Sequence, residues 1–173
     1  MKLSSCIIAV ILSLISPICF AQSLDAIEKA DKEVLEVWNA TPLTFRRAIF
    51  VSEEPAGFGS YTDRDSNAFK QGEPLIIYSE PVGYAWREKG DGSYTIGFAM
   101  DLAIKKANGD IIAGKENFGR KEVVVKSKAR EFMLYATVDI TGAPPGSYVV
   151  GIRVRDLASD EFGVISLPFR IVE

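Results

Sequence analysis

The sequence contains no histidine, and both of its cysteines, Cys6 and Cys19, lie near the amino terminus. Without histidine the chain lacks the commonest general base, the commonest metal ligand and the Ser-His-Asp triad. Removal of the amino-terminal segment would also exclude thiol catalysis, cysteine-bound zinc and disulfide bonds. Only carboxylate chemistry or a Ser-Lys pair then remains for an enzyme.

Neither of these remaining chemistries has a recognisable arrangement in the sequence. Glu53 and Glu54 are neighbours, so their side chains point to opposite sides of an extended chain. A glycosidase instead needs two carboxyl groups that face each other across a cleft. Ser127 and Lys128 are also adjacent and diverge in the same way, which excludes a hydrogen-bonded dyad. We therefore predict that the protein is not an enzyme and needs no cofactor.

The amino-terminal residues 1–21 have the pattern of a secretory signal peptide. Lys2 supplies the positive charge, Cys6 to Ile18 is almost wholly apolar, and a cleavage site follows between Ala21 and Gln22. The apolar run is short for a membrane span. The alternatives are an uncleaved amino-terminal anchor and a lipoprotein that begins at Cys19. We expect export to the periplasm of a bacterium, or secretion.

Cleavage would leave 152 of the 173 residues, a length that suits one domain with a sizeable core. Removal of Lys2 lowers the number of basic residues by one from the 20 of the whole chain, while all 23 acidic residues remain. The net charge is then about −4, which gives no reason to expect nucleic acid or an anionic membrane as a partner. We expect a protein or another cell-envelope component as the partner, with no stable membrane insertion.

A helix is predicted from about Leu24 to Trp38. Apolar residues recur near one helical stripe, Ser23 can cap the first turn, and Pro42 stops any continuation. We interpret this helix as a packing element or spacer, with a partner-binding amphipathic helix as the alternative. The predicted organisation is a signal peptide over residues 1–21, a helix and linker over 22–42, and a β domain over 43–173.

From residue 43 onward the apolar residues follow the alternating pattern of half-buried β-strands. A loop rich in Gly, Ser and Asp spans residues 53–72, and the Asp91-Gly92 and Asn108-Gly109 pairs favour hairpin turns. This pattern predicts an antiparallel two-sheet β-sandwich, because each strand has one apolar face to bury. The predicted strands are 43–51, 73–86 with a break at Pro81, 94–105, 111–118, 122–126, 132–140, 148–156 and 162–172.

The segment GAPPGSYVVGIRVRD, from Gly142 to Asp156, resembles the penultimate strand of immunoglobulin-like and fibronectin-type-III-like domains. The resemblance implies that Tyr148 is a corner tyrosine whose hydroxyl bonds back to the backbone, and that residues 162–172 form the closing strand. The cysteine pair of true immunoglobulin domains is absent. The whole chain without its signal also looks like uncharacterised exported proteins of Gram-negative bacteria, a likeness that implies a compartment and no activity.

The loop from Asp63 to Pro74 begins with the D-x-D-x-N pattern of calcium-binding loops. Oxygen atoms of Asp63, Asp65 and Asn67 can converge on one ion, and Glu73 could complete the shell. The pattern departs from a complete calcium loop at its sixth and twelfth positions. The loop is therefore interpreted as solvated, with a calcium-stabilised module as the weaker alternative.

The stretch YSEPVGYAW carries the candidate ligand-binding residues Tyr78, Glu80, Tyr84 and Trp86. In one interpretation these side chains form an exposed aromatic and acidic surface that stacks on a sugar ring or another small ligand. In the other, a bulge between the proline and the glycine changes the face of the strand. Tyr84 and Trp86 would then enter the core, and Tyr78 and Glu80 would lie outside.

Basic residues gather toward the carboxyl-terminal half of the chain, at Arg120, Lys121, Lys126, Lys128 and Arg130. Charges on an exposed sheet edge discourage pairing with another chain, so we interpret the cluster as edge protection. An anion-binding patch is the alternative. Together these features predict a non-catalytic exported binding module of the cell envelope. The alternatives are a carbohydrate- or small-ligand-binding module and, more weakly, a calcium-stabilised one.

Overall fold

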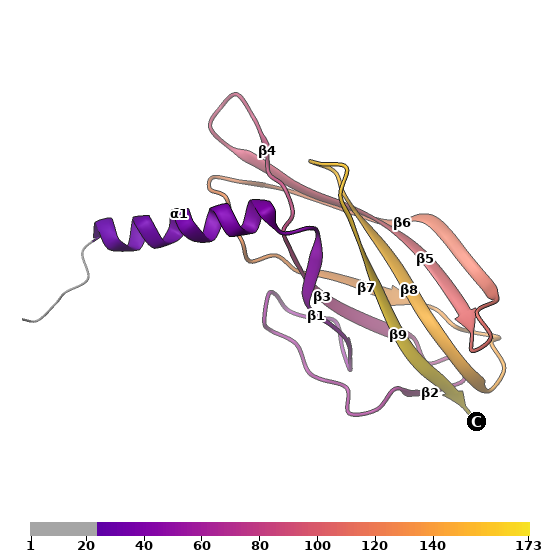
Figure 1. Cartoon of the computed structure of the whole chain (residues 1–173). Helices are drawn as coiled ribbons and strands as arrows, with labels where there is room; N and C mark the ends of the chain where they lie inside the picture. Colours follow the sequence, from indigo (N-terminus) through magenta and orange to yellow (C-terminus); the bar gives the residue numbers. More distant parts are fainter. Residues whose placement is uncertain (1–23) are drawn as a thin grey trace, which may run out of the picture.

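The computed structural model describes residues 24–173, so the predicted signal peptide at 1–21 lies outside the described residues. The structure is mainly β, with one helix at the start of the described chain (Figure 1). Among these residues no helix is long and apolar enough to span a membrane. The elements are α1 (Leu24–Ala40), β1 (Thr44–Val51), β2 (Ala68–Lys70), β3 (Leu75–Val82), β4 (Arg87–Glu88), β5 (Tyr94–Lys106), β6 (Ile111–Val125), β7 (Leu134–Val138), β8 (Gly146–Asp156) and β9 (Phe162–Val172).

The strands form two sheets, which we call the small sheet and the large sheet. The small sheet has the order β1-β3-β7, and both of its pairings are antiparallel. In the large sheet the order is β2-β9-β8-β5, with β4 and β6 also paired to β5. The pairing of β2 with β9 is parallel, and the other strand pairings of this sheet are antiparallel. The prediction of mainly antiparallel β-structure behind one helix is confirmed.

One hydrophobic cluster contains buried residues from both sheets. The small sheet contributes buried residues such as Leu75, Ile77 and Leu134, and the large sheet contributes Phe98 and Ile152. This arrangement follows from strand alternation, which places every second side chain on the same face. Burial of these side chains from both sheets supplies the main driving force for folding.

The predicted role of Tyr148 is confirmed by a hydrogen bond. Its hydroxyl donates to the backbone carbonyl of Pro144 at 2.8 Å, and its ring stacks on Phe169 with the centroids 5.5 Å apart. The ring therefore packs in the core while the polar tip finds a partner close by in the chain. The bond holds the connection before β8 against the start of that strand.

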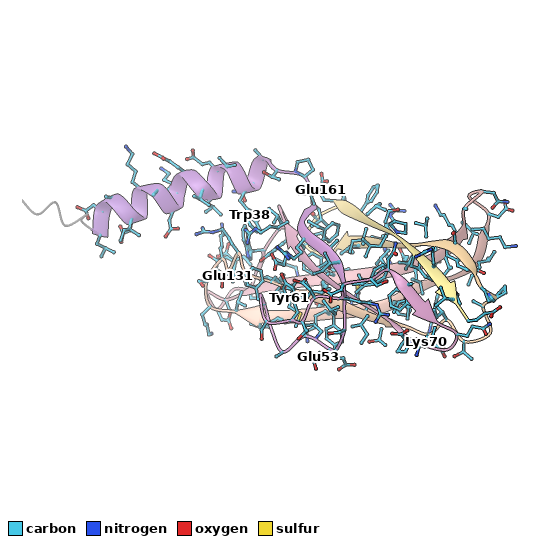
Figure 2. All side chains as sticks on the ribbon, turned by 90° about the horizontal axis from the view of Figure 1, so that it is seen from below. Trp38, Glu53, Tyr61, Lys70, Glu131 and Glu161 are labelled. Atoms are coloured by element: carbon cyan, nitrogen blue, oxygen red, sulfur yellow. The ribbon has the colours of Figure 1, made fainter. Side chains whose placement is uncertain are left out.

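Helix α1 extends away from the sheets and contacts them at its carboxyl-terminal end (Figure 1). Trp38 is its buried residue, 6% exposed, and its indole nitrogen donates to the Tyr84 carbonyl at 2.8 Å. The indole also makes an edge contact with Tyr84 and a tilted contact with Trp86. Figure 2 places Trp38 between the helix and the strands. The tryptophan therefore anchors a helix whose first turns project from the sheets.

Most strand boundaries agree with the predicted ones to within a few residues, with three differences. The predicted strand 73–86 ends as β3 at Val82, and the short strand β4 at Arg87–Glu88 was not predicted. The predicted strands 111–118 and 122–126 form one long strand, β6, which bulges opposite the Met100–Leu102 segment of β5. Asn117 adopts a φ of 49° in this bulge, and its backbone N–H donates to Asp101. The predicted loop 53–72 contains the short strand β2, which the sequence pattern did not indicate.

Candidate functional site on the N-terminal helix

Tyr78 and Glu80 do not form an exposed surface, which corrects the prediction made for them. Both lie on the face of β3 that points away from the core, as expected, but Tyr78 is 0% exposed and Glu80 only 6%. The loop between β1 and β2 covers this face and places Tyr61 against the Tyr78 ring, with the centroids 4.3 Å apart. A face that points away from the core is therefore still buried.

Burial of this pair is possible because its polar atoms are partnered. The Tyr78 hydroxyl donates to Oε1 of Glu80 at 2.8 Å and accepts a hydrogen bond from the backbone N–H of Gly59, also at 2.8 Å. Burial of the phenol, opposed by the Gly59 bond and reinforced by the Glu80 carboxylate, raises the pKa of Tyr78 to about 12. The pair joins the covering loop to the small sheet.

Tyr84 and Trp86 turn toward the interior, as the second interpretation of the stretch predicted. Tyr84 is 1% exposed and Trp86 packs partly buried against the core, and both side chains donate a hydrogen bond to the carbonyl of Ala129 at 2.9 Å. Burial also raises the pKa of Tyr84 above the usual tyrosine value. The four predicted ligand-binding residues therefore belong to two buried groups, which leaves the carbohydrate-binding alternative without an exposed aromatic surface.

The change of face occurs at Gly83 rather than at a bulge in β3. Pro81 remains paired with Phe45, and the irregularity lies on β1, between Phe45 and Arg47. Gly83 has a φ of 80°, and a Cβ added there would lie 2.4 Å from the backbone oxygen of Thr41. Only glycine fits this conformation and this close approach of two chain segments.

Two of the predicted calcium ligands, Glu73 and Asn67, have other partners in the structure. Glu73 is already in use, because Oε1 pairs with Arg64 at 2.8 Å and Oε2 accepts the N–H of Lys70 at 2.8 Å. Asn67 donates its side-chain amide to the carbonyl of Pro168. Within residues 24–173 no three acidic, cysteine or histidine side chains are grouped so that they could hold a metal, so Asp63, Asp65 and Glu73 do not form such a group. Asp63 and Asp65 do line one hollow together with Asn67. The Arg64 guanidinium already pairs with Glu73, one of the four predicted ligands.

An exposed apolar stripe on α1 is the best candidate for a functional surface. It comprises Ile27, Ala30, Val34 and Val37, which we call the docking face. Their spacing of three and four residues places them on one side of a helix. Exposure of the three larger residues is 52%, 48% and 68%, so the strands leave this side of α1 uncovered.

A hollow of about 380 Å³ lies at the end of the docking face nearest the sheets. Val34 and Val37 line it together with Trp38 and with Val82 of β3. Because its walls come from both the helix and the small sheet, the hollow extends the apolar stripe onto the strands. A side chain from another molecule could fill it and contact both elements at once.

Acidic residues border the docking face on both sides. With 3.6 residues per turn, Glu33 lies along one border and Asp31 along the other, whereas Lys32 lies on the opposite side of the helix. Lys29 is next to Glu33, and its Nζ lies 4.0 Å from Oε1 of Glu33. Asp31 also binds Arg130 at 2.6 Å, which ties the middle of α1 to the segment before β7. The docking face is therefore apolar at its centre and negative at its edges.

The sequence identified the helix and placed Ile27 and Val34 on an apolar stripe, but it did not indicate that these residues stay uncovered. Its pattern is that of a helix that packs on a core along its whole length, and only Trp38 is buried in that way. A scan of the chain against protein-family models finds no match, and neither does a search of curated proteins.

Proposed function

We propose that the chain is a non-catalytic, exported binding module of the bacterial cell envelope. It would act in the periplasm or after secretion, and it would hold a protein partner on the docking face of α1. The observation that carries the proposal is the exposure of Ile27, Val34 and Val37 along a projecting helix. Exposed apolar stripes with polar borders are typical of protein interaction sites.

The chemistry of the docking face favours one kind of partner. An apolar helix or groove with basic residues along its borders would bury the stripe and would also pair with Glu33 and Asp31. The net charge of α1 is negative, so an anionic membrane surface would repel it. A second copy of the same helix would place like charges near one another. A basic-bordered protein surface therefore fits best.

The proposal of a non-catalytic role rests on composition and on the buried aromatic stretch. No histidine occurs in the chain, and no cysteine occurs after Cys19. Tyr78 and Glu80, the acidic and aromatic pair that a ligand would have contacted, serve to fix a loop on the small sheet. Binding of a partner through the apolar face of a helix needs neither histidine, cysteine nor an exposed aromatic and acidic pair. The residues present are therefore compatible with this function.

The scaffold that we propose is an immunoglobulin-like two-sheet sandwich. Three features support it: the two sheets contribute to one core, the strand pairings are almost all antiparallel, and Tyr148 makes the corner bond of such domains. The sandwich would act as a rigid base that presents α1. A solved experimental structure with both sheets face to face would test this part directly.

Site-specific photo-crosslinking in living cells of the native host tests the function. A photoreactive residue at Val34 should crosslink to one protein, whereas the same residue at Lys32 on the opposite side should not. Binding of that protein to the purified chain should weaken with Val34→Glu and with Glu33→Lys, and should be unchanged with Lys32→Glu. Equal crosslinking from both sides, or no effect of Val34→Glu, would reject the proposal.

A further inference from the structure

The large sheet extends past the small sheet on the side of β6. Residues directly opposite each other in an antiparallel pair share a face. Lys121 of β6 pairs with Phe98 of β5, and Val123 pairs with Ile96. Phe98 and Ile96 are 0% exposed and face the core, so Lys121 and Val123 point to the core side of the sheet as well. Lys121 is nevertheless exposed.

The small sheet ends at β7, and this strand has an unpaired edge. Among residues 24–173, β7 pairs with β3 alone and β6 pairs with β5 alone. The unpaired edge of a strand presents backbone N–H and C=O groups without partners from another strand. A groove of about 380 Å³ lies between the edge of β7 and the middle of β6. The position of the groove is that of a fourth strand next to β7.

The groove has an apolar floor and a basic rim. Met100, Phe118 and Leu134 line it, and Gly119 leaves it open, because a Cβ there would lie 2.6 Å from the end of the Met100 side chain. On its rim, Arg120 already binds Glu122 at 2.6 Å. Within the described chain Lys121 has no ion-pair partner within 4.0 Å, so its charge is available to a ligand.

From these features we propose that the groove binds an extended segment of a partner protein, which adds to the small sheet as a strand beside β7. Alternate side chains of the segment would be apolar and would contact Met100, and one carboxylate would pair with Lys121. This site is separate from the docking face on α1 and does not depend on the function proposed for it.

An extended segment fits this groove better than a helix or a small molecule. The backbone groups at the free edge of β7 can be paired by a strand whose axis lies about 4.8 Å away, whereas a helix already uses its own backbone groups internally. A strand also presents side chains on alternate sides, so that one set enters the groove. The methionine at its floor can adapt to different apolar side chains. Specificity would then come from the carboxylate that meets Lys121.

A phage-displayed library of random linear peptides, selected on the full chain, tests the proposal. The enriched peptides should alternate apolar residues and carry an aspartate or glutamate. Lys121→Glu should weaken binding of a synthetic copy of the best peptide by at least about tenfold. Gly119→Leu should block it, because the new side chain occupies the groove. Lys126→Glu, just beyond β6 and outside the groove, should leave it unchanged.

Two further measurements test whether the peptide pairs with β7 as a strand and whether its site is separate from the docking face. Bound peptide should slow amide hydrogen exchange in residues 134–138, which side-chain contact alone would not do. Val34→Glu on α1 should leave peptide binding intact, which separates this site from the docking face. The proposal is overturned by a selection without enrichment, or by peptides that bind Lys121→Glu as tightly as the wild type. A dimer in solution that Gly119→Leu dissociates would also overturn it, by naming a second copy as the occupant.

Discussion

Replacement of Trp38 by alanine should weaken the whole protein and release α1. The indole is 6% exposed and contacts the rings of Tyr84 and Trp86 at centroid distances of 5.0 and 5.6 Å. Its N–H also satisfies the carbonyl of Tyr84. The substitution therefore removes a large apolar side chain, two aromatic contacts and the partner of a buried carbonyl in one step.

The expected loss in the free energy of unfolding is about 3–5 kcal/mol, as for other buried tryptophans replaced by alanine. For a chain of this length such a loss lowers Tm by roughly 6–20 °C. The stability of Trp38→Phe should lie between those of the wild type and Trp38→Ala. This variant keeps a ring in the core but leaves the Tyr84 carbonyl without its donor, which costs about 1–3 kcal/mol. The order of the two variants thus separates ring packing from the hydrogen bond.

Urea unfolding followed by circular dichroism measures the global loss, and amide hydrogen exchange measures the helix. An isolated helix of 17 residues is only marginally stable in water, so residues 24–40 should exchange rapidly once Trp38 is gone. Val37→Ala, on the 68% exposed side of α1, is the control and should change stability by less than about 0.5 kcal/mol. A loss below about 1 kcal/mol for Trp38→Ala, or a helix that stays protected, would refute the anchoring role.

Three more perturbations test the buried stretch and the loop. Tyr78 has a pKa of about 12 when folded and about 10 when unfolded, so the protonated phenol stabilises the fold below pH 10. This stability is lost between pH 10 and 12 at about 1.4 kcal/mol per pH unit. In urea titrations over this range, the free energy of unfolding of Tyr78→Phe should fall less steeply with pH than that of the wild type. Equal slopes for the two proteins would show that Tyr78 is not the cause. Gly83→Ala should cost more than about 4 kcal/mol because carbonyls of Thr41 and Pro42 block its Cβ. Gly72→Ala, with a similar φ of 78° and open space, should cost only about 1–2 kcal/mol, and equal losses would reject the steric argument. The Tm should be the same in calcium and in chelator, because Glu73 is already paired with Arg64. A higher Tm in calcium that is lost in Asp65→Ala would support the calcium-stabilised alternative instead.

The strands that could be predicted are those whose burial alternates without interruption. In β8 from Tyr148 onward every second residue is buried, and in β9 every second residue is buried or, at Leu167, partly buried; each strand begins within two residues of its predicted start. β5 likewise ends one residue from the predicted position. Such strands are held by local pairing with a sequence neighbour, so the pattern in the chain carries nearly all of the information. The corner bond of Tyr148 is local in the same sense, since it joins residues four apart.

The burial of Tyr78 and Glu80 could not be predicted in this way. Alternation indicates which side of the sheet a residue lies on, and this assignment was right, but it does not indicate what covers that side. The cover is the loop that carries Gly59 and Tyr61, and the loop lacks the apolar periodicity of a regular element. Its contact with β3 depends on one hydrogen bond and one ring pair between segments distant in the sequence.

Strand β2 and the bulge of β6 were missed for a related reason. Residues 68–70 form a strand only because β9 offers them an edge, and the pairing is parallel across about a hundred residues of chain. In β6, Asp101 and Arg155 hold Asn117 at the bulge, with a hydrogen bond of 2.7 Å from Arg155 to its side chain. Tertiary partners therefore decide both features, whereas local propensity does not distinguish them from loop.

The two proposed binding surfaces carry opposite charges, which raises the question of whether one copy could bind another. The docking face on α1 has acidic borders, and the β6–β7 groove has a free lysine at its rim. However, the backbone groups of α1 are satisfied within the helix, so α1 inserted into the groove would leave the edge of β7 unpaired. The attraction between Glu33 and Lys121 would then have to offset buried backbone groups without hydrogen bonds, each of which costs about 1–3 kcal/mol. A surface ion pair contributes at most about 1 kcal/mol, so a chain of copies joined in this way is disfavoured and each surface remains free for a different partner.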